Sequence, residues 1–237
     1  MADEIPERDP LADLVSRSIG SHVPSVEAEV LANDEGVDRK RLRFTTSAGS
    51  SSAIFERLPR GEVTQAQLLP FLARKTDRVP KLHARGLPPP HASLGPWVLI
   101  EDVYDAALAC DGDPVGIIEA KLAIEAAVLK DLPALRALGL RDDARTLPPA
   151  LAAAPRALVH GELVCANARR VARGVVLLGW RRAFLGPAVL DAATLALDLE
   201  RSGRSKDASA VRHAASAYGD AALLEEAERF LSSSASH

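Results

Sequence analysis

The stretch LVHGELVCANARRVARGVVLLGW, residues 158–180, combines the end of a strand, a polar loop and a short hairpin. The apolar residues before His160 predict a strand, and two further short strands at 168–171 and 175–178 flank a tight turn at Gly174. The loop between the first strand and the hairpin carries an imidazole at His160, a carboxylate at Glu162 and an amide at Asn167. A polar loop held between strands in this way is typical of a catalytic or ligand-binding site.

The composition predicts a folded protein without an overall affinity for polyanions. The chain has 237 residues, of which 47% are apolar, enough for one large domain or two modest lobes. A formal charge of -3 gives no general attraction to nucleic acid or to an anionic membrane, so neither is expected as a partner. No apolar run approaches the roughly 20 residues of a membrane span, and the start MADEIPERDP is acidic. We therefore expect a cytoplasmic protein.

The two cysteines, Cys110 and Cys165, lie far apart in the sequence and lack the CxxC spacing of metal or redox sites. A pair of reduced thiols without a catalytic role is the expectation for a cytoplasmic protein.

The first half of the chain has the alternating pattern of strands. Segments 26–33, 39–47 and 51–58 predict an antiparallel meander, followed by a helix at 63–74. The proline-rich passage 79–96 predicts irregular structure, and 97–103 predicts a strand that acts as a hinge.

The second half is rich in alanine and leucine, and helical patterns dominate it. The fold class is therefore α+β, with a small antiparallel β-sheet lobe containing one helix, and an α-rich lobe carrying a short β-hairpin. The predicted boundaries are 1–25 for an N-terminal extension with a helix, 26–103 for the β-rich lobe and hinge, 104–231 for the helical lobe and 232–237 for a disordered tail. This order of elements is that of a bilobal, protein-kinase-like fold.

Several motifs in order resemble the aminoglycoside phosphotransferase family of small-molecule kinases. That family's usual pattern is His-Gly-Asp, four residues and Asn, then a hairpin and Ile-Asp-Trp or Ile-Asp-Phe; here HGELVCAN is followed by LLGW. The segment FLGPAVLDAATLALDL at 184–199 and the hinge WVLIEDV at 97–103 also fit. The resemblance covers about residues 26–200, and its specificity lies in the order of the motifs.

The resemblance implies a role for each matching position in the helical lobe. Phosphoryl transfer needs a carboxylate to orient the acceptor hydroxyl, and a carboxylate and an amide to hold Mg²⁺ against the phosphates of ATP. Glu162 stands at the position of the catalytic aspartate, Asn167 matches the amide ligand of the metal, and Gly179 stands where the metal-binding aspartate is lost. His160 and Asp191 match residues that support the loop.

The β-rich lobe supplies the remaining positions of the family pattern. Glu101 and Val103 match the hinge that contacts the nucleotide, and Glu56 stands at the position of the lysine that grips the phosphates. The glutamate that would pair with that lysine aligns with Gln65. A negative charge at Glu56 repels phosphate, by about 1 kcal/mol at ~4 Å even in the dielectric of water.

The departures from the family pattern at Glu162 and Gly179 differ in their expected effect on phosphoryl transfer. Glu162 keeps the charge but moves the carboxylate by roughly 1 Å, which can cost on the order of 10²-fold in rate. Gly179 has no side chain to offer, although magnesium normally takes one or two carboxylates beside the phosphate oxygens. Ordinary alternatives stay open for two positions: Glu162 as a solvated loop carboxylate, and Asn167 as a turn asparagine.

Three functions follow from these observations. The first is a kinase-like protein with weak or no phosphotransfer, acting as a binding or regulatory module for a small molecule or a protein partner and needing no cofactor. The second is an active ATP-dependent and Mg²⁺-dependent kinase of a small hydroxylated molecule, using Glu162 and Asn167. The third is an unrelated α+β helical scaffold whose HGE string is accidental, and a continuous helix over 158–178 would favour it. The first is preferred because the changes at Glu56, Gln65, Glu162 and Gly179 all affect charge.

Overall fold

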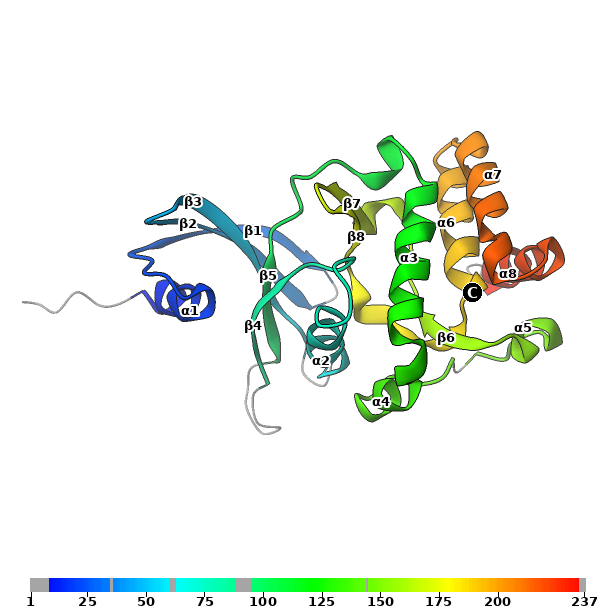
Figure 1. Cartoon of the computed structure of the whole chain (residues 1–237), viewed down its shortest axis with the longest axis horizontal. Coiled ribbons are helices and arrows are strands. Elements are labelled where there is room, and N and C mark those ends of the chain that lie inside the picture. Colours follow the sequence, from blue (N-terminus) through cyan, green and yellow to red (C-terminus); the bar gives the residue numbers. More distant parts are fainter. Residues whose placement is uncertain (1–8, 35, 60–62, 88–94, 144, 235–237) are drawn as a thin grey trace, which may run out of the picture. The chain divides into compact units, whose positions relative to one another are not determined.

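The computed structural model describes residues 9–34, 36–59, 63–87, 95–143 and 145–234. The chain divides into two compact units (Figure 1). The first comprises Met1–Ala66 and Lys81–Asp102, and the second comprises Gln67–Pro80 and Val103–His237. Helices and antiparallel strands both contribute, so the predicted α+β class is confirmed.

The first unit, called the β-rich unit below, contains a five-stranded antiparallel sheet. Its strands lie in the order β1 (Val26–Asp34), β2 (Val37–Thr46), β3 (Gly49–Arg57), β5 (Trp97–Glu101) and β4 (Leu82–Gly86). The first three strands form the predicted meander, because each pairs antiparallel with the next along the chain.

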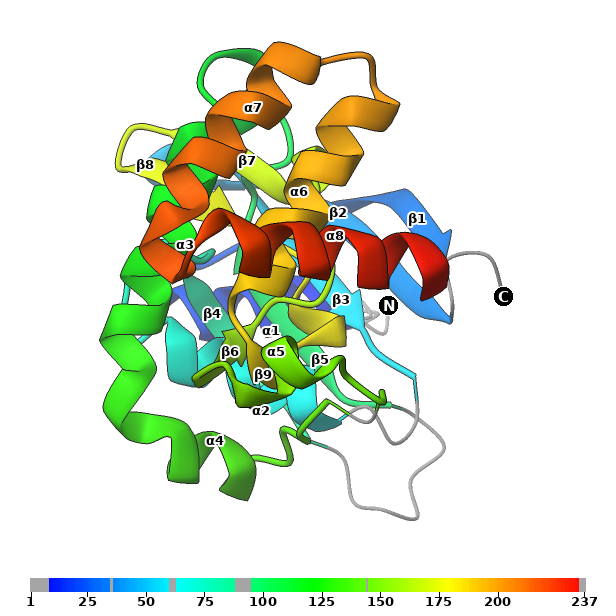
Figure 2. The same cartoon turned by 90° about the vertical axis from the view of Figure 1, so that its right-hand side faces the viewer.

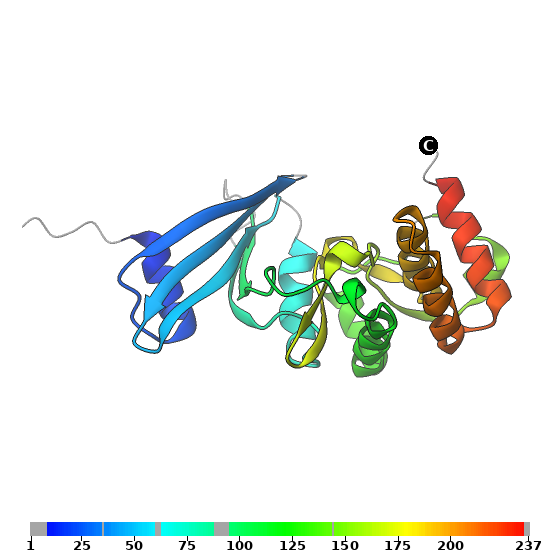
Figure 3. The same ribbon diagram turned by 90° about the horizontal axis from the view of Figure 1, so that it is seen from above.

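Helix α1 (Pro10–Ile19) covers one face of this sheet. The helix begins after Asp9, whose carboxylate accepts a hydrogen bond from the amide of Leu11 at 2.9 Å. Its buried Val15 belongs to the same apolar cluster as Leu42 and Phe44 of β2. The figures show α1 alongside the sheet in two views at right angles (Figures 1 and 3).

Strand β4 lies within the proline-rich passage that was expected to be irregular, so that expectation was wrong for Leu82–Gly86. The strand itself contains no proline, and among the described strands it pairs with β5 alone, at the edge of the sheet. The sequence LHARG has no clear alternation of apolar and polar residues, so its pairing depends on the neighbouring strand and not on a local pattern.

The second unit is mostly helical and is called the helical unit below. Its helices are the end of α2 (Val63–Leu72), then α3 (Val115–Val128), α4 (Leu132–Ala137), α5 (Pro149–Ala153), α6 (Val189–Arg201), α7 (Ser205–Ala214) and α8 (Ala221–Ser234). Helix α6 packs against both α7 and α8 (Figure 2). No helix in the described part of the chain is both long enough and apolar enough to cross a bilayer. Helix α8 continues to Ser234, into the predicted tail, and 235–237 lie outside the described residues.

Two strand pairs lie in the helical unit. The predicted hairpin is formed by β7 (Ala168–Val171) and β8 (Gly174–Leu177). Strand β6 (Arg156–Val159) pairs with β9 (Phe184–Pro187), which was not predicted. The strands between 156 and 177 exclude the continuous helix that would have favoured the unrelated-scaffold alternative.

The expectation of two free thiols was wrong, because Cys110 and Cys165 form a disulfide bond. The two residues are 55 positions apart in sequence, yet their Cα atoms lie 5.6 Å apart. The sequence gave no sign of this contact, because it forms only when the fold brings the segment before α3 next to the loop after β6.

Candidate functional site

The loop after β6 is held in shape by one buried carboxylate. Asp191, in the first turn of α6, accepts hydrogen bonds from the amide of His160 at 2.7 Å and from the amide of Gly161 at 3.1 Å. Its side chain is 1% exposed. Two backbone donors that face away from water are thereby satisfied, which gives the loop a defined start.

The ring of His160 ties the loop to the hairpin. Its Nε2 lies 2.6 Å from the carbonyl oxygen of Leu178, and its Nδ1 accepts a hydrogen bond from the amide of Glu162 at 3.3 Å. These contacts place the proton on Nε2. Complete burial lowers the pKa of His160, and the ring lies against Trp180. Both ring nitrogens bond to the backbone, so the geometry suits a structural residue better than a general base.

A buried lysine that the sequence reasoning missed stands behind Asp191. The Nζ of Lys121 on α3 lies 3.0 Å from the Asp191 carboxylate, donates to the carbonyl of Leu158 at 2.6 Å and also contacts Glu125. Burial alone would lower the pKa of Lys121, but the two carboxylates raise it. Burial raises the pKa of Glu125. The available signal was a charged residue on the apolar face of α3, four positions before an acid.

Glu162 and Asn167 both lie in the loop after His160. The side chain of Asn167 donates from Nδ2 to the carbonyl of Glu162 at 2.9 Å, which leaves its Oδ1 as an acceptor. The half-buried Glu162 carboxylate makes no hydrogen bond or ion pair with any residue that the structure describes. The loop therefore presents one carboxylate and one amide oxygen, neither of which is bonded to a residue within the described ranges.

Gly179 lies next to Asn167. Its backbone is left-handed, with φ 73° and ψ 44°. A Cβ added there would lie 3.1 Å from Oδ1 of Asn167, so a side chain at this position would touch the amide. The fold thus brings together the two positions that match metal ligands, and one of them has no side chain.

The residues present do not make a complete site for Mg²⁺. Asn167 and Glu162 can each offer oxygen, but Gly179 offers none. Among the described residues, no group of three or more His, Cys, Asp or Glu side chains is arranged to hold a metal ion.

In the β-rich unit, Glu56 is buried and paired with an arginine. Its side chain is 5% exposed, and its Oε1 lies 2.6 Å from Nε of Arg39 on the neighbouring strand β2. A second buried pair joins Arg41 to Asp102 at 2.7 Å. The carboxylate at the position of the phosphate-binding lysine is therefore part of the sheet's own ion pairing. Gln65 lies on α2, and its side chain is outside what the structure describes.

The two hinge positions have different surroundings. Glu101 ends β5, and its carboxylate accepts a hydrogen bond from the amide of Lys81 at 3.1 Å. Val103 is buried against Val176 and Leu178. Val103 therefore helps to hold the segment that leads to Gly179.

A cavity of about 360 Å³ opens beside the start of the loop in the helical unit. It is lined by Asp142, Asp143, Arg145, Val159, Gly161, Arg182, Phe184, Leu190, Asp191, Thr194 and Leu231. Each of its carboxylates has a cationic partner: Arg136 for Asp142, Arg145 for Asp143 and Lys121 for Asp191. The guanidinium of Arg145 also lies over the rings of Phe184 and Phe230. The cavity therefore combines apolar walls with balanced charge.

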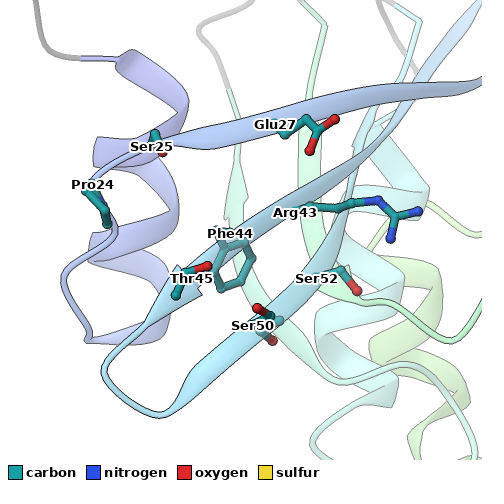
Figure 4. A pocket seen from close by; sticks show the side chains of 9 residues that line it. Pro24, Ser25, Glu27, Arg43, Phe44, Thr45, Ser50 and Ser52 are labelled. Atoms are coloured by element: carbon teal, nitrogen blue, oxygen red, sulfur yellow. The ribbon is translucent and has the colours of Figure 1, made fainter.

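A larger groove of about 550 Å³ lies on the β-rich unit (Figure 4). It is lined by Pro24, Ser25, Glu27, Arg43, Phe44, Thr45 and Ser50 to Ser52. None of the predicted site residues lies in it. Arg43 is half exposed and paired with Glu29 at 2.9 Å, so the groove has an ordinary solvated polar surface.

Comparison with known proteins identifies the fold. No protein-family model and no curated protein sequence matches the chain. Among solved structures, an aminoglycoside-3'-phosphotransferase of type VIII is 16% identical, with a TM-score of 0.57, covering 92% of this chain and 100% of that one. An aminoglycoside phosphotransferase from Streptomyces rimosus is 14% identical, with a TM-score of 0.52, covering 92% of this chain and 96% of that one.

A third similar structure is an amicoumacin kinase solved with AMP-PNP, Ca²⁺ and its amicoumacin ligand. It is 10% identical, with a TM-score of 0.54, covering 97% of this chain and 80% of that one. These likenesses extend over nearly the whole chain, and they confirm the predicted kinase-like architecture. The chain has the fold of the aminoglycoside phosphotransferases and related small-molecule kinases.

Proposed function

We propose that this chain is an aminoglycoside phosphotransferase-like protein that binds a small molecule beside the His160 loop and transfers phosphate weakly or not at all. The observation that carries the proposal is the geometry at Gly179. A Cβ added at this position would lie 3.1 Å from the amide oxygen of Asn167, so a carboxylate here would stand beside the amide as a second metal ligand, and glycine leaves the pair incomplete.

The β-rich unit supports the same conclusion. Glu56 is buried and paired with Arg39, so the lysine position holds a negative charge that the fold itself uses. A phosphate group approaching it would meet a carboxylate instead of an ammonium group. Cytoplasmic localisation remains part of the proposal, as do ATP and Mg²⁺ as ligands of any residual activity.

The cavity beside the loop is the proposed binding site. Because each lining carboxylate already has a cationic partner, the cavity attracts a polycation less than unpaired acids would. Its volume of about 360 Å³ lies within the usual range for small-molecule pockets. We therefore favour a compact neutral molecule as the ligand.

A nucleotide titration tests the loss of phosphotransfer. A nucleotide present at 100 times its dissociation constant would stabilise the chain by about 2.7 kcal/mol, which raises Tm by several degrees. We expect ATP, ADP and GTP, with or without Mg²⁺, to raise Tm by less than about 1 °C, well below the rise that tight binding would give. A clear magnesium-dependent rise would contradict the proposal.

Restoring the two acids makes the test sharper. The double variant Glu162→Asp with Gly179→Asp should gain Mg²⁺-dependent nucleotide binding if the loop is otherwise intact. Glu162→Asp with Gly179→Asn is the matched control, since asparagine tolerates the left-handed backbone as aspartate does but carries no charge. Equal behaviour of the two variants would indicate that Gly179 is not the decisive change.

The binding site is tested with a small panel of ligands. Glucose, myo-inositol, choline and kanamycin can be compared by thermal shift, with the Thr194→Phe variant filling the cavity and Ser52→Phe as the control in the other groove. We expect a neutral compound to raise Tm in the wild type and in Ser52→Phe but not in Thr194→Phe. A response to kanamycin alone would contradict the preference for a neutral ligand.

One observation favours the second function, an active kinase. The Glu162 carboxylate is not engaged with any described residue, so it is available to orient a hydroxyl group. In that case ATP consumption would depend on a hydroxylated acceptor and would be lost in Glu162→Gln. No turnover across a broad panel of sugars and amino alcohols would exclude this function for those acceptors.

A further inference from the structure

The disulfide joins the candidate loop to a segment far away in the sequence. Cys165 begins the short helix η3 (Cys165–Asn167), which follows Glu162 and ends the loop at Asn167. Cys110 lies in η1 (Ala109–Asp111), ahead of α3. The bond therefore ties the loop at a point two residues before the amide that matches a metal ligand.

The two halves of the loop are held by different means. The amides of His160 and Gly161 are bonded to Asp191, as described above. The amide of Cys165 is bonded to Asp198 at 2.9 Å, and the amide of Asn167 to the carbonyl of Val164 at 3.0 Å. The second half is also held by the buried Leu163 and by the carbonyl of Asn167, which accepts a hydrogen bond from the amide of Leu178 at 2.8 Å. Between these two anchors, Cys165 is the point at which a covalent bond fixes the loop to a distant segment.

The two cysteine residues differ in their exposure to solvent. Cys110 is completely buried, whereas Cys165 is only half-buried. A thiol in solution therefore reaches Cys165 first. We propose that Cys110–Cys165 is a reversible redox site, opened by a dithiol reductant, and that its reduction loosens the part of the loop after the buried Leu163, residues 164–167. This inference does not depend on the proposed function.

The reaction is a thiol–disulfide exchange in two steps. A thiolate of the reductant attacks the sulfur of Cys165, forming a mixed disulfide, and Cys110 leaves as a thiolate that takes up a proton. The second thiol of the reductant then attacks the reductant's first sulfur, which is bonded to Cys165 in the mixed disulfide. Cys165 is released as a thiolate and takes up a proton. The reductant loses two electrons and two protons and becomes a disulfide, while the protein gains two thiols.

The neighbouring contacts limit the change to the loop. The segment around η1 keeps a backbone hydrogen bond from the amide of Arg170 to the carbonyl of Ala107 at 2.9 Å, and Arg204 donates to the carbonyl of Cys110. These bonds do not involve the sulfurs. Reduction therefore removes a covalent constraint without removing the contacts that position α3 and the hairpin.

Thiol counting and melting test the bond itself. We expect a native sample purified without reductant to show no free thiol, and two after treatment with dithiothreitol. Dithiothreitol should lower the Tm of the wild type by roughly 10 °C, because a constraint across 55 residues is lost. The double variant Cys110→Ser with Cys165→Ser should melt like the reduced wild type and should not respond to dithiothreitol.

Amide-resolved hydrogen exchange tests the effect on the loop. On reduction, the amides of Cys165 and Asn167 should exchange at least about tenfold faster relative to those of His160 and Gly161, which serve as internal controls. Two free thiols in the untreated protein would overturn the proposal. So would an equal change at all four amides, which would indicate general destabilisation and no control of the loop.

Discussion

The loop support, formed by His160, Asp191 and Lys121, differs from the ligand-facing set, Glu162, Asn167 and Gly179. Every member of the loop support is buried and bonded to several partners. In the ligand-facing set, the Glu162 carboxylate has no bond to a described residue and Gly179 has no side chain. A loop of this kind keeps its shape whether or not its ligand-facing residues suit the chemistry. Likeness of fold therefore says little about activity.

The largest expected effect comes from breaking the loop support at Asp191. Asp191→Ala leaves the ammonium group of Lys121 short of a buried partner and two amides without an acceptor. We expect a loss of about 3–5 kcal/mol of unfolding free energy, measured by urea denaturation. Adding Lys121→Met should recover part of the loss because the buried charge is removed too. A loss below about 1 kcal/mol in the single variant would contradict this account.

A smaller effect is expected in the β-rich unit. Arg39→Ala removes the arginine beside the buried Glu56 and should cost about 1–3 kcal/mol, since a buried carboxylate loses a charged partner. Arg43→Ala is the matched control on the same strand, because its pair with Glu29 is about half exposed and should contribute less than about 1 kcal/mol. Equal losses in the two variants would mean that burial does not set the value of these pairs.

Next is the pH dependence of stability. Burial lowers the pKa of His160 below the 6.5 of the unfolded chain, so the unfolded state binds more protons as pH falls through this range. Stability should therefore decrease from pH 7 to pH 5, by up to about 1.4 kcal/mol per pH unit for this one proton.

The contribution of His160 is obtained as the difference between the wild type and His160→Gln. This subtraction is needed because the raised pKa of Glu125 acts in the opposite direction. Burial also lowers the pKa of His83, and the His83→Gln variant should keep the His160 contribution. An unchanged pH profile in His160→Gln would contradict the assignment.

The smallest effect on stability is expected at Glu162, in the ligand-facing set. Glu162→Gln should change the unfolding free energy by less than about 0.5 kcal/mol, because its carboxylate has no bond to a described residue. Gly179→Ala should cost about 1–2 kcal/mol at a φ of 73°, and Gly179→Asn less. A loss of several kcal/mol in Glu162→Gln would move this residue from the ligand-facing set into the loop support.

Much of the fold could be predicted because its signals are local. The meander of β1 to β3 and the hairpin of β7 and β8 follow from alternation and turn residues within short segments. Strands β4 and β9 could not be predicted, since their pairing depends on β5 and β6. The same limit applies to Lys121, whose role depends on a carboxylate 70 positions further along the chain, at Asp191.

The sequence alone determined which chemical groups the loop can offer: a carboxylate at 162, an amide at 167, and no side chain at 179. Tertiary structure alone decided which groups meet. It placed Gly179 against Asn167, paired Glu56 with Arg39, and bonded Cys110 to Cys165. The physical reason is that side-chain chemistry is a property of each residue, whereas a contact between distant residues exists only after the chain has folded around a common core.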